Sequence, residues 1–280
     1  MPRSGAITTK RAQPAWGFRI VRGVGWAMIW LGLLTLGFVV HQLWVTSWLA
    51  ELNQGKLAVE VEERFVSAEI VWVEVDDAGE PIPGGEILAG ATGTDGDPIP
   101  GPRTLQIESD PEPHSAFAII RIPAIERLQE GWNVVSGVRV SDLKSGAGHM
   151  PDTPLPGQPG NAVVSGHRTT YGQPFHELDS LTPGDRIEVE TALGTHVYAV
   201  RSWDEVVAAN PDFAGQTVDA LGGGGAGVVV RPNALWVTDP IDGGWLTLTT
   251  CHPKFSASRR LIVFAELVDG PNAAVIGATS

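Results

Sequence analysis

The single cysteine of this 280-residue chain, Cys251, is the first residue whose chemistry needs an explanation. It ends the run WLTLTTC, which is typical of a β-strand, and His252 and Pro253 begin a loop after it. One cysteine cannot form an intrachain disulfide, so the thiol is buried and inert, paired with another molecule, or reactive. A reactive thiol needs a base or a cation that favours the thiolate, and a donor that stabilises the oxyanion formed by its attack.

His167 is the histidine best placed to be that base, among the seven in the chain. It ends the strand-like run GNAVVSGH and precedes the polar loop RTTYGQPF, and strand ends that open onto loops are where a rigid scaffold presents reactive groups. His252 adjoins Cys251, but consecutive side chains of a strand point to opposite faces. His41 lies in an apolar segment and His114 in a Gly- and Pro-rich one, so neither suits catalysis.

Arg260 supplies the third chemical group, because it opens the run RLIVFAEL nine residues after Cys251. Hairpin geometry would place the start of this strand beside the end of the preceding one, and a guanidinium offers fixed planar donors to an oxyanion. Each of the three residues also has an ordinary interpretation, as a small buried side chain, a loop histidine or a solvated edge charge. Residue types and spacing alone leave a catalytic and a structural role both open.

The elements that must position these residues are short strands. Gly and Pro are abundant, at 34 and 21 residues, and they separate eight runs rich in Val, Ile, Thr and aromatic residues: AFAIIRIPAI, WNVVSGVRV, GNAVVSGH, DRIEVET, THVYAVRSW, GVVVRP, GWLTLTTC and RLIVFAEL. A closed barrel suits so many short strands because closure removes exposed edges. The sequence predicts an all-β, eight-stranded β-barrel with short helices near 141–145 and 174–181, and a flexible surface loop at the GGGG run from Gly222 to Gly225.

An apolar segment near the N-terminus predicts a transmembrane helix over residues 23–48, since no charged residue lies between Arg22 and Glu51. Tryptophans lie near both of its ends, as interfacial anchors do. A cleaved signal peptide is the alternative, but its apolar part is usually about 7–15 residues and is followed by a small-residue cleavage site. Five basic residues precede the segment, so we expect the tail 1–22 to be cytoplasmic and the residues after the helix to be extracellular.

The remaining chain divides by composition into a predicted stalk at 49–113, a catalytic domain at 114–270 and a C-terminal tail at 271–280. The part of the stalk from Asp76 to Pro113 is dense in Gly, Pro, Asp and Glu, and a lid that mimics the substrate is the alternative to a linker. The net charge of −13 makes nucleic acid an improbable partner. The sequence contains no zinc-ligand spacing, Walker loop or dinucleotide fingerprint, so we expect no metal and no cofactor.

Several motifs together resemble the sortase family of membrane-anchored cysteine transpeptidases. TLTTC, RLIVFAEL and GHRTTYGQPF carry the resemblance, which continues through RIPAI, GHMPDT and PGQPGN and covers about residues 115–268. The run VVHQLWVTSWLA is similar to the membrane segment of the class E sortases of high-GC Gram-positive bacteria. The resemblance implies a nucleophile at Cys251, a histidine at His167 and an arginine at Arg260, with Arg259 possible if the strand register shifts by one residue.

The same resemblance implies the reaction. The chain is expected to cleave the Thr–Gly bond of an LPxTG-like sorting-signal peptide, in the LAxTG variant of class E, through a thioacyl enzyme. It would then join the exported protein to an amine of lipid II or of a peptidoglycan stem peptide. A pilin-polymerising sortase and a catalytically silent, membrane-tethered binding protein on the same barrel are the alternatives. The insertion Gly222 to Gly227 is expected to enlarge a loop near the substrate groove.

Overall fold

A computed structural model describes residues 16–75, 81–87 and 104–277, and the chain divides into two compact units that meet between Val45 and Thr46 in the sequence. The first unit contains α1 (Trp16–Val40) and the π-helical turn η1 (His41–Val45). Helix α1 buries none of its residues and is long and apolar enough to cross a membrane. It contains the larger part of the span predicted over 23–48.

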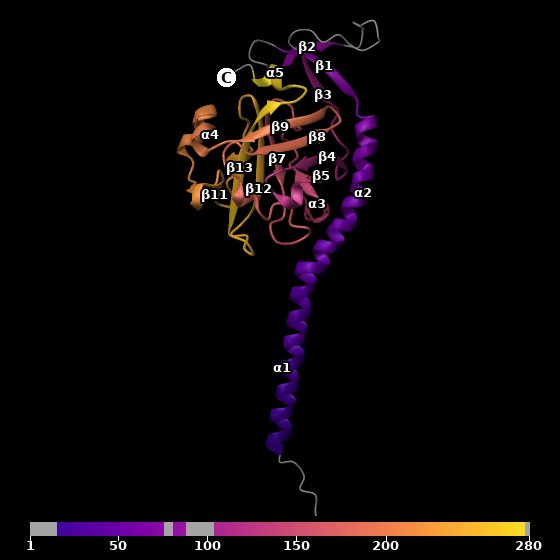
Figure 1. Ribbon diagram of the computed structural model, residues 1–280, viewed down its shortest axis with the longest axis vertical. Coiled ribbons are helices and arrows are strands. Elements are labelled where there is room, and N and C mark those ends of the chain that lie inside the picture. The colour runs from indigo at the N-terminus through magenta and orange to yellow at the C-terminus, as the bar shows by residue number, and fades with distance from the viewer. Residues whose placement is uncertain (1–15, 76–80, 88–103, 278–280) are drawn as a thin grey trace, which may run out of the picture. The chain divides into compact units, whose positions relative to one another are not determined.

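The second unit is built on a closed β-barrel (Figure 1). Its ring follows the order β13-β12-β7-β6-β5-β4-β8-β9 and is closed by pairing of β13 with β9. The β5–β6 and β7–β12 pairings are parallel and the others are antiparallel. The eight strands are β4 (Ala116–Arg121), β5 (Trp132–Ser136), β6 (Ala147–His149), β7 (Gly160–Ser165), β8 (Arg186–Thr191), β9 (Gly194–Val200), β12 (Gly244–His252) and β13 (Arg259–Asp269). The predicted all-β, eight-stranded barrel with short helices is confirmed.

One predicted barrel strand lies outside the ring. The run GVVVRP forms β11 (Val228–Val230), which pairs with β10 (Asp219–Ala220) on one side and with the first part of β13 on the other. Strand β13 is long enough for both roles, because its residues 260–262 pair with β11 and its residues 265–269 pair with β9. The eighth barrel strand is instead β6. Its three residues, AGH, have no alternating pattern from which a strand could be predicted.

Short helices occupy the connections between strands. Helix α3 (Val140–Ser145) lies where the sequence predicts one, and the 3₁₀ turn η3 (Leu178–Ser180) falls within the predicted 174–181. The GGGG run, predicted as a flexible surface loop, is exposed at Gly222–Gly224, which form the short 3₁₀ turn η5, in which Gly223 and Gly224 both have φ of +83°. The other short helices are η2 (Glu126–Leu128), α4 (Trp203–Ala209), η4 (Pro211–Gly215), η6 (Leu235–Thr238) and α5 (Ala273–Ile276).

Two apolar cores lie on opposite faces of β12 and β13. Leu246 and Leu248 of β12 point into the barrel interior, while Trp245 joins a second core on the outside. That outer core consists largely of aromatic rings from α4, η4, η6 and β13, with Phe213 and Trp236 in edge contact at 5.0 Å. The strands that carry the C-terminal motifs are therefore packed on both faces, which fixes the positions of their ends.

The segment predicted as a stalk at 49–113 differs from that expectation in its described parts. Helix α2 (Thr46–Ser67) buries Leu57 and Val61 against Ala116 and Val135 of β4 and β5, and Figure 1 shows it along the barrel side. The strands β1 (Ile70–Val75), β2 (Pro81–Ile87) and β3 (Thr104–Glu108) form a small sheet. Leu105 of β3 is fully buried in the barrel core, so this region is packed onto the barrel. The predicted linker residues 76–80 and 88–103 lie outside the described residues.

Candidate active site

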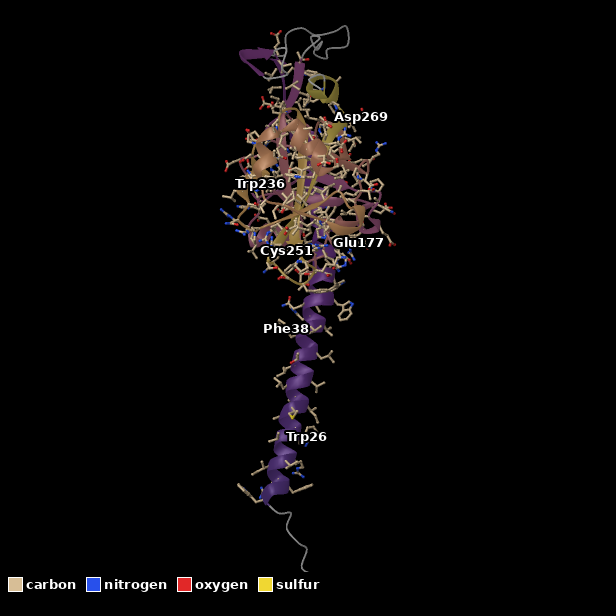
Figure 2. The ribbon with its side chains drawn as sticks, turned by 90° about the vertical axis from the view of Figure 1, so that its left-hand side faces the viewer. Trp26, Phe38, Glu177, Trp236, Cys251 and Asp269 are labelled. Atoms are coloured by element: carbon tan, nitrogen blue, oxygen red, sulfur yellow. The ribbon has the colours of Figure 1, made fainter. Side chains whose placement is uncertain are left out.

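Cys251 lies at the C-terminal end of β12 and faces Arg260 directly across the ladder to β13. Side chains that are opposite one another in an antiparallel pair lie on the same face, about 5 Å apart at Cβ. Cys251 is a partly exposed free thiol, not a fully buried one. The structure therefore brings together the thiol and the arginine nine residues after it, as the predicted hairpin requires. Figure 2 shows Cys251 and Asp269 at opposite ends of the barrel.

Arg259 and Arg260 have different partners, which separates the two alternatives left open by the sequence. Arg259 is paired in the ladder with His252 and forms an exposed ion pair with Asp219 of β10, with Nη1 and Oδ2 3.1 Å apart. Arg260 Nη1 donates only to main-chain oxygens, those of Ala257 and Arg259, both at 3.0 Å. The register favours Arg260, since its side chain shares a face with the thiol and carries no carboxylate partner among the described residues.

His167 follows β7, the strand parallel to β12. Ser165 pairs with Thr249, and the Gly166 amide donates to the Thr249 carbonyl at 3.0 Å. Two residues further along these parallel strands come His167 and Cys251, so both lie at the same end of the barrel. A Cβ at position 166 would lie 2.5 Å from the ring of Phe175, so glycine allows the loop after His167 to pack closely here.

The surroundings of His167 favour its neutral form. Its ring centroid is 5.0 Å from that of Tyr171, and Lys144 Nζ of α3 lies 5.3 Å from the Tyr171 ring. Burial, and to a smaller extent the positive charge of Lys144, lower the pKa of His167 below its usual value. The Nε2 atom is buried, and no residue in the described part of the chain forms a hydrogen bond with it. A neutral imidazole with a free nitrogen can exchange a proton with a bound substrate.

Arg168 is a residue of this site that the sequence analysis did not single out. Its side chain is 2% exposed and forms an ion pair with Asp179 near η3, with Nη2 and Oδ2 2.7 Å apart. Its Nη1 donates to the carbonyl oxygen of Cys251 at 3.2 Å and to Nδ1 of His252 at 2.8 Å. The available signal was its place directly after His167 in GHRTTYG. Within the described ranges, no cluster of three or more His, Cys, Asp or Glu side chains could hold a metal ion.

Comparisons with known proteins find similar chains among the sortases. Sortase SrtE1 of Streptomyces coelicolor is 26% identical over 261 residues, covering 89% of this chain and 57% of its own length, so this chain spans little more than half of that relative. Sortase SrtE2 of the same organism is 26% identical over 252 residues, covering 88% of this chain and 81% of its own length. The solved structure of sortase E from Streptomyces avermitilis is 29% identical, with a TM-score of 0.44, over 61% of this chain and all of that one.

The family model described as the sortase domain matches residues 120–268, which is more than half of the chain. The matched range begins within β4 and ends within β13, and so includes at least part of every strand of the ring, together with Cys251, His167 and both arginines. The chain therefore belongs to the sortase family, whose members are cysteine transpeptidases.

Proposed function

We propose that this protein is a membrane-anchored transpeptidase that cleaves the Thr–Gly bond of an LPxTG-like sorting signal, in its LAxTG form. The observation that carries the proposal is the meeting of three groups at one end of the barrel. Cys251 and Arg260 are partners in the β12–β13 ladder, and His167 ends the neighbouring parallel strand. Such a nucleophile, base and oxyanion donor are the parts that acyl transfer through a thioester needs.

Each residue has one role in the proposed reaction. The Cys251 thiol passes its proton to the neutral imidazole of His167, and the resulting thiolate attacks the threonine carbonyl carbon. Arg260 donates hydrogen bonds to the oxygen on which negative charge develops. His167 gives a proton to the departing glycine amine, so the peptide bond breaks and a thioester remains on Cys251. An incoming amine then loses a proton to His167 and attacks the thioester, which forms a new amide and restores the thiol.

The acceptor and the location form the outer part of the proposal. The acceptor is an amine of lipid II or of a peptidoglycan stem peptide, and the product is an exported protein attached to the cell wall. Helix α1 anchors the chain, with the basic tail 1–22 in the cytoplasm and the catalytic domain 114–270 outside. The class E relatives support the LAxTG preference by similarity alone.

Cleavage of a quenched fluorescent LAxTG peptide by the full chain in detergent micelles, with hydroxylamine as acceptor, tests the proposal. We expect a threonine hydroxamate product with the wild type and no product with Cys251→Ala. An LPxTG peptide in parallel measures the preference between the two signals. The proposal is wrong if the wild type cleaves neither peptide, or if cleavage persists after Cys251 is removed.

A further inference from the structure

The buried side chain of Arg168 places a positive charge inside the protein. A guanidinium remains protonated at all ordinary pH values, and burying one is costly unless a counter-ion and hydrogen-bond acceptors replace its water. Here Asp179 supplies the counter-ion at 2.7 Å, and Lys254 also approaches Asp179, at 3.7 Å. The ion pair balances the charge, so the reason for a buried arginine at this position lies in its other contacts.

The acceptors of Arg168 identify that reason. Its Nη1 donates to the main-chain oxygen of Cys251 and to the ring of His252, the last two residues of β12. Beyond Thr249 the pairing of β7 with β12 ends, so Cys251 lacks a ladder partner on that side. Arg168 takes the place of that partner, because it follows His167 on the chain that continues β7. One planar group thus links the nucleophile's backbone to the loop that carries the histidine.

The neighbouring histidines fit the same arrangement. Nδ1 of His252 accepts from Arg168, so the proton of its neutral ring lies on Nε2. Burial, followed by the charge of Arg168, lowers the pKa of His252, which keeps this acceptor available. His176 Nδ1 donates to the main-chain oxygen of Arg168 at 2.7 Å and fixes the backbone on the other side. His252 therefore contributes as an acceptor for Arg168, although its own side chain does not share the face of Cys251.

We propose that Arg168 is a positioning residue that holds the end of β12 and the loop after His167 in one relative arrangement, so that thiol and imidazole stay in register. This inference rests on the proposed function for its effect on turnover. The bond to the Cys251 carbonyl acts on the backbone of the nucleophile, not on the substrate. Its loss is expected to reduce kcat while KM for the peptide changes little, because misplacement of a reacting group by about 1 Å costs rate.

The decisive experiment compares Arg168→Lys with Arg168→Gln in the full chain. Lysine keeps the charge opposite Asp179 but lacks the planar fork that reaches two acceptors at once, whereas glutamine removes the charge as well. Arg201→Gln is the matched control. Arg201 also pairs with carboxylates, Glu205 and Glu266, but Glu266 lies six residues along β13 from Arg260, roughly 20 Å away.

We expect kcat to fall about tenfold in Arg168→Lys and about a hundredfold in Arg168→Gln, with KM within about threefold of wild type and Arg201→Gln unchanged. Amide hydrogen exchange in a peptide containing Cys251 should accelerate in both Arg168 variants. A folded Arg168→Lys with wild-type kcat and exchange overturns the proposal, and so does a loss carried wholly by KM. If Arg168→Gln does not fold, Arg168→Lys decides alone. If the wild type cleaves no peptide, the proposed function fails, while the exchange comparison still decides whether Arg168 holds Cys251.

Discussion

The two ends of the barrel each contain a histidine whose pKa is lowered by burial, and of these two only His167 lies at the end that carries Cys251, the proposed nucleophile. His167 is partly exposed, next to the strand end that carries Cys251, and Lys144 adds to its shift. His196 on β9 is fully buried towards the other end, and burial lowers its pKa to about 4. In each ring one nitrogen has no hydrogen-bond partner among the described residues, Nε2 of His167 and Nδ1 of His196.

The surroundings of His196 are closed. A Cβ at Gly157 would lie 2.0 Å from the imidazole, so backbone packs directly on the ring. Its Nε2 is 3.2 Å from the hydroxyl of Thr191, and the neighbouring residue, Ala192, donates its amide to the buried carboxyl of Glu108 at 3.1 Å. Burial raises the pKa of Glu108 to about 7. These groups join β3 to the β8–β9 hairpin, and both His196 and Glu108 are buried there.

The comparison shows what a perturbed pKa indicates in this protein. Perturbed groups concentrate at functional sites, yet structural networks perturb them too. The histidine at the closed end is the fully buried one, because the backbone at Gly157 packs directly on its ring. A lowered pKa next to a partly exposed thiol and a cross-strand arginine is the stronger sign of catalysis. The proposed assignment therefore rests on geometry at the strand end, and the direction of the pKa shift supports it.

Replacing each histidine with glutamine is the strongest test of the difference between His167 and His196. His167→Gln should lower kcat/KM for the LAxTG peptide about a thousandfold, because general acid–base catalysis is lost. His196→Gln should leave the activity of the folded protein within about threefold of wild type. Instead it should lower the free energy of unfolding by about 1–3 kcal/mol, since it disturbs a fully buried site. Peptide cleavage and urea unfolding of both variants measure the two effects.

Two results would contradict the assignment. Full activity in a folded His167→Gln would remove the histidine from the mechanism, and a folded, inactive His196→Gln would give the closed end a role in catalysis.

The two adjacent arginines at the end that carries Cys251 should also differ in their effect on activity. Arg260→Gln should reduce kcat by about 10²–10³-fold, the effect of removing one oxyanion donor. Arg259→Gln breaks only the exposed ion pair with Asp219, so both activity and stability should change little. Steady-state kinetics of the two purified variants test this, with circular dichroism to establish that both are folded. Equal losses of kcat in the two variants, or a larger loss in Arg259→Gln, would contradict the choice of Arg260 as the oxyanion donor.

Much of the barrel could be predicted because the strand signals are local, whereas the three proposed catalytic positions came from the resemblance to the sortase family, since residue types and spacing left both roles open. Alternating strands such as β12 and β13 carry their pattern within one run, and Cys251 and Arg260 belong to one hairpin. Strand β6 has three residues and no pattern, and β11 has a barrel-like pattern but pairs outside the ring. Composition shows that a segment can form a strand, but not which edge it will join.

Residues whose role depends on distant contacts could not be predicted. Arg168 follows a histidine in a polar loop, where arginines are usually solvated, and its burial depends on the end of β12, 83 residues later. The structure differs from the predicted stalk for the same reason, because the packing of this segment depends on residues far along the chain. Helix α2 has a sparse apolar stripe, and its packing on Ala116 and Val135, together with the hydrogen bonds of Gln54 to Asn133, makes it part of the folded unit.

The buried groups Glu108 and His196 should make the free energy of unfolding depend on pH. Glu108, with its pKa raised to about 7, keeps its proton in the folded state, so its contribution falls as pH rises from about 4.5 to 7. His196, with its pKa lowered to about 4, stays neutral when folded, so its contribution falls as pH drops from about 6.5 to 4. The two slopes oppose one another in the wild type.

Replacing one of the two groups at a time should therefore separate its contribution to the pH dependence of the unfolding free energy. Relative to wild type, Glu108→Gln should gain stability with rising pH across this range and His196→Gln should lose it, each by on the order of 3 kcal/mol. Urea unfolding at several pH values between 4 and 7 measures both trends. Parallel profiles in the two variants and the wild type would show that neither group changes its protonation on folding.

The smallest expected effect concerns the charge near His167. Lys144 is exposed and lowers the pKa of His167, so Lys144→Gln should raise that pKa and move the His167 inflection of the pH–rate profile to higher pH. Lys144→Arg, which keeps the charge, is the matched control and should leave the inflection in place. The imidazole proton signal in an NMR titration, assigned by its absence in His167→Gln, measures the shift directly. An upward shift in Lys144→Gln alone would locate the influence in the lysine charge. No shift, or equal shifts in both variants, would leave burial as the sole cause, as it is for His196 at the closed end.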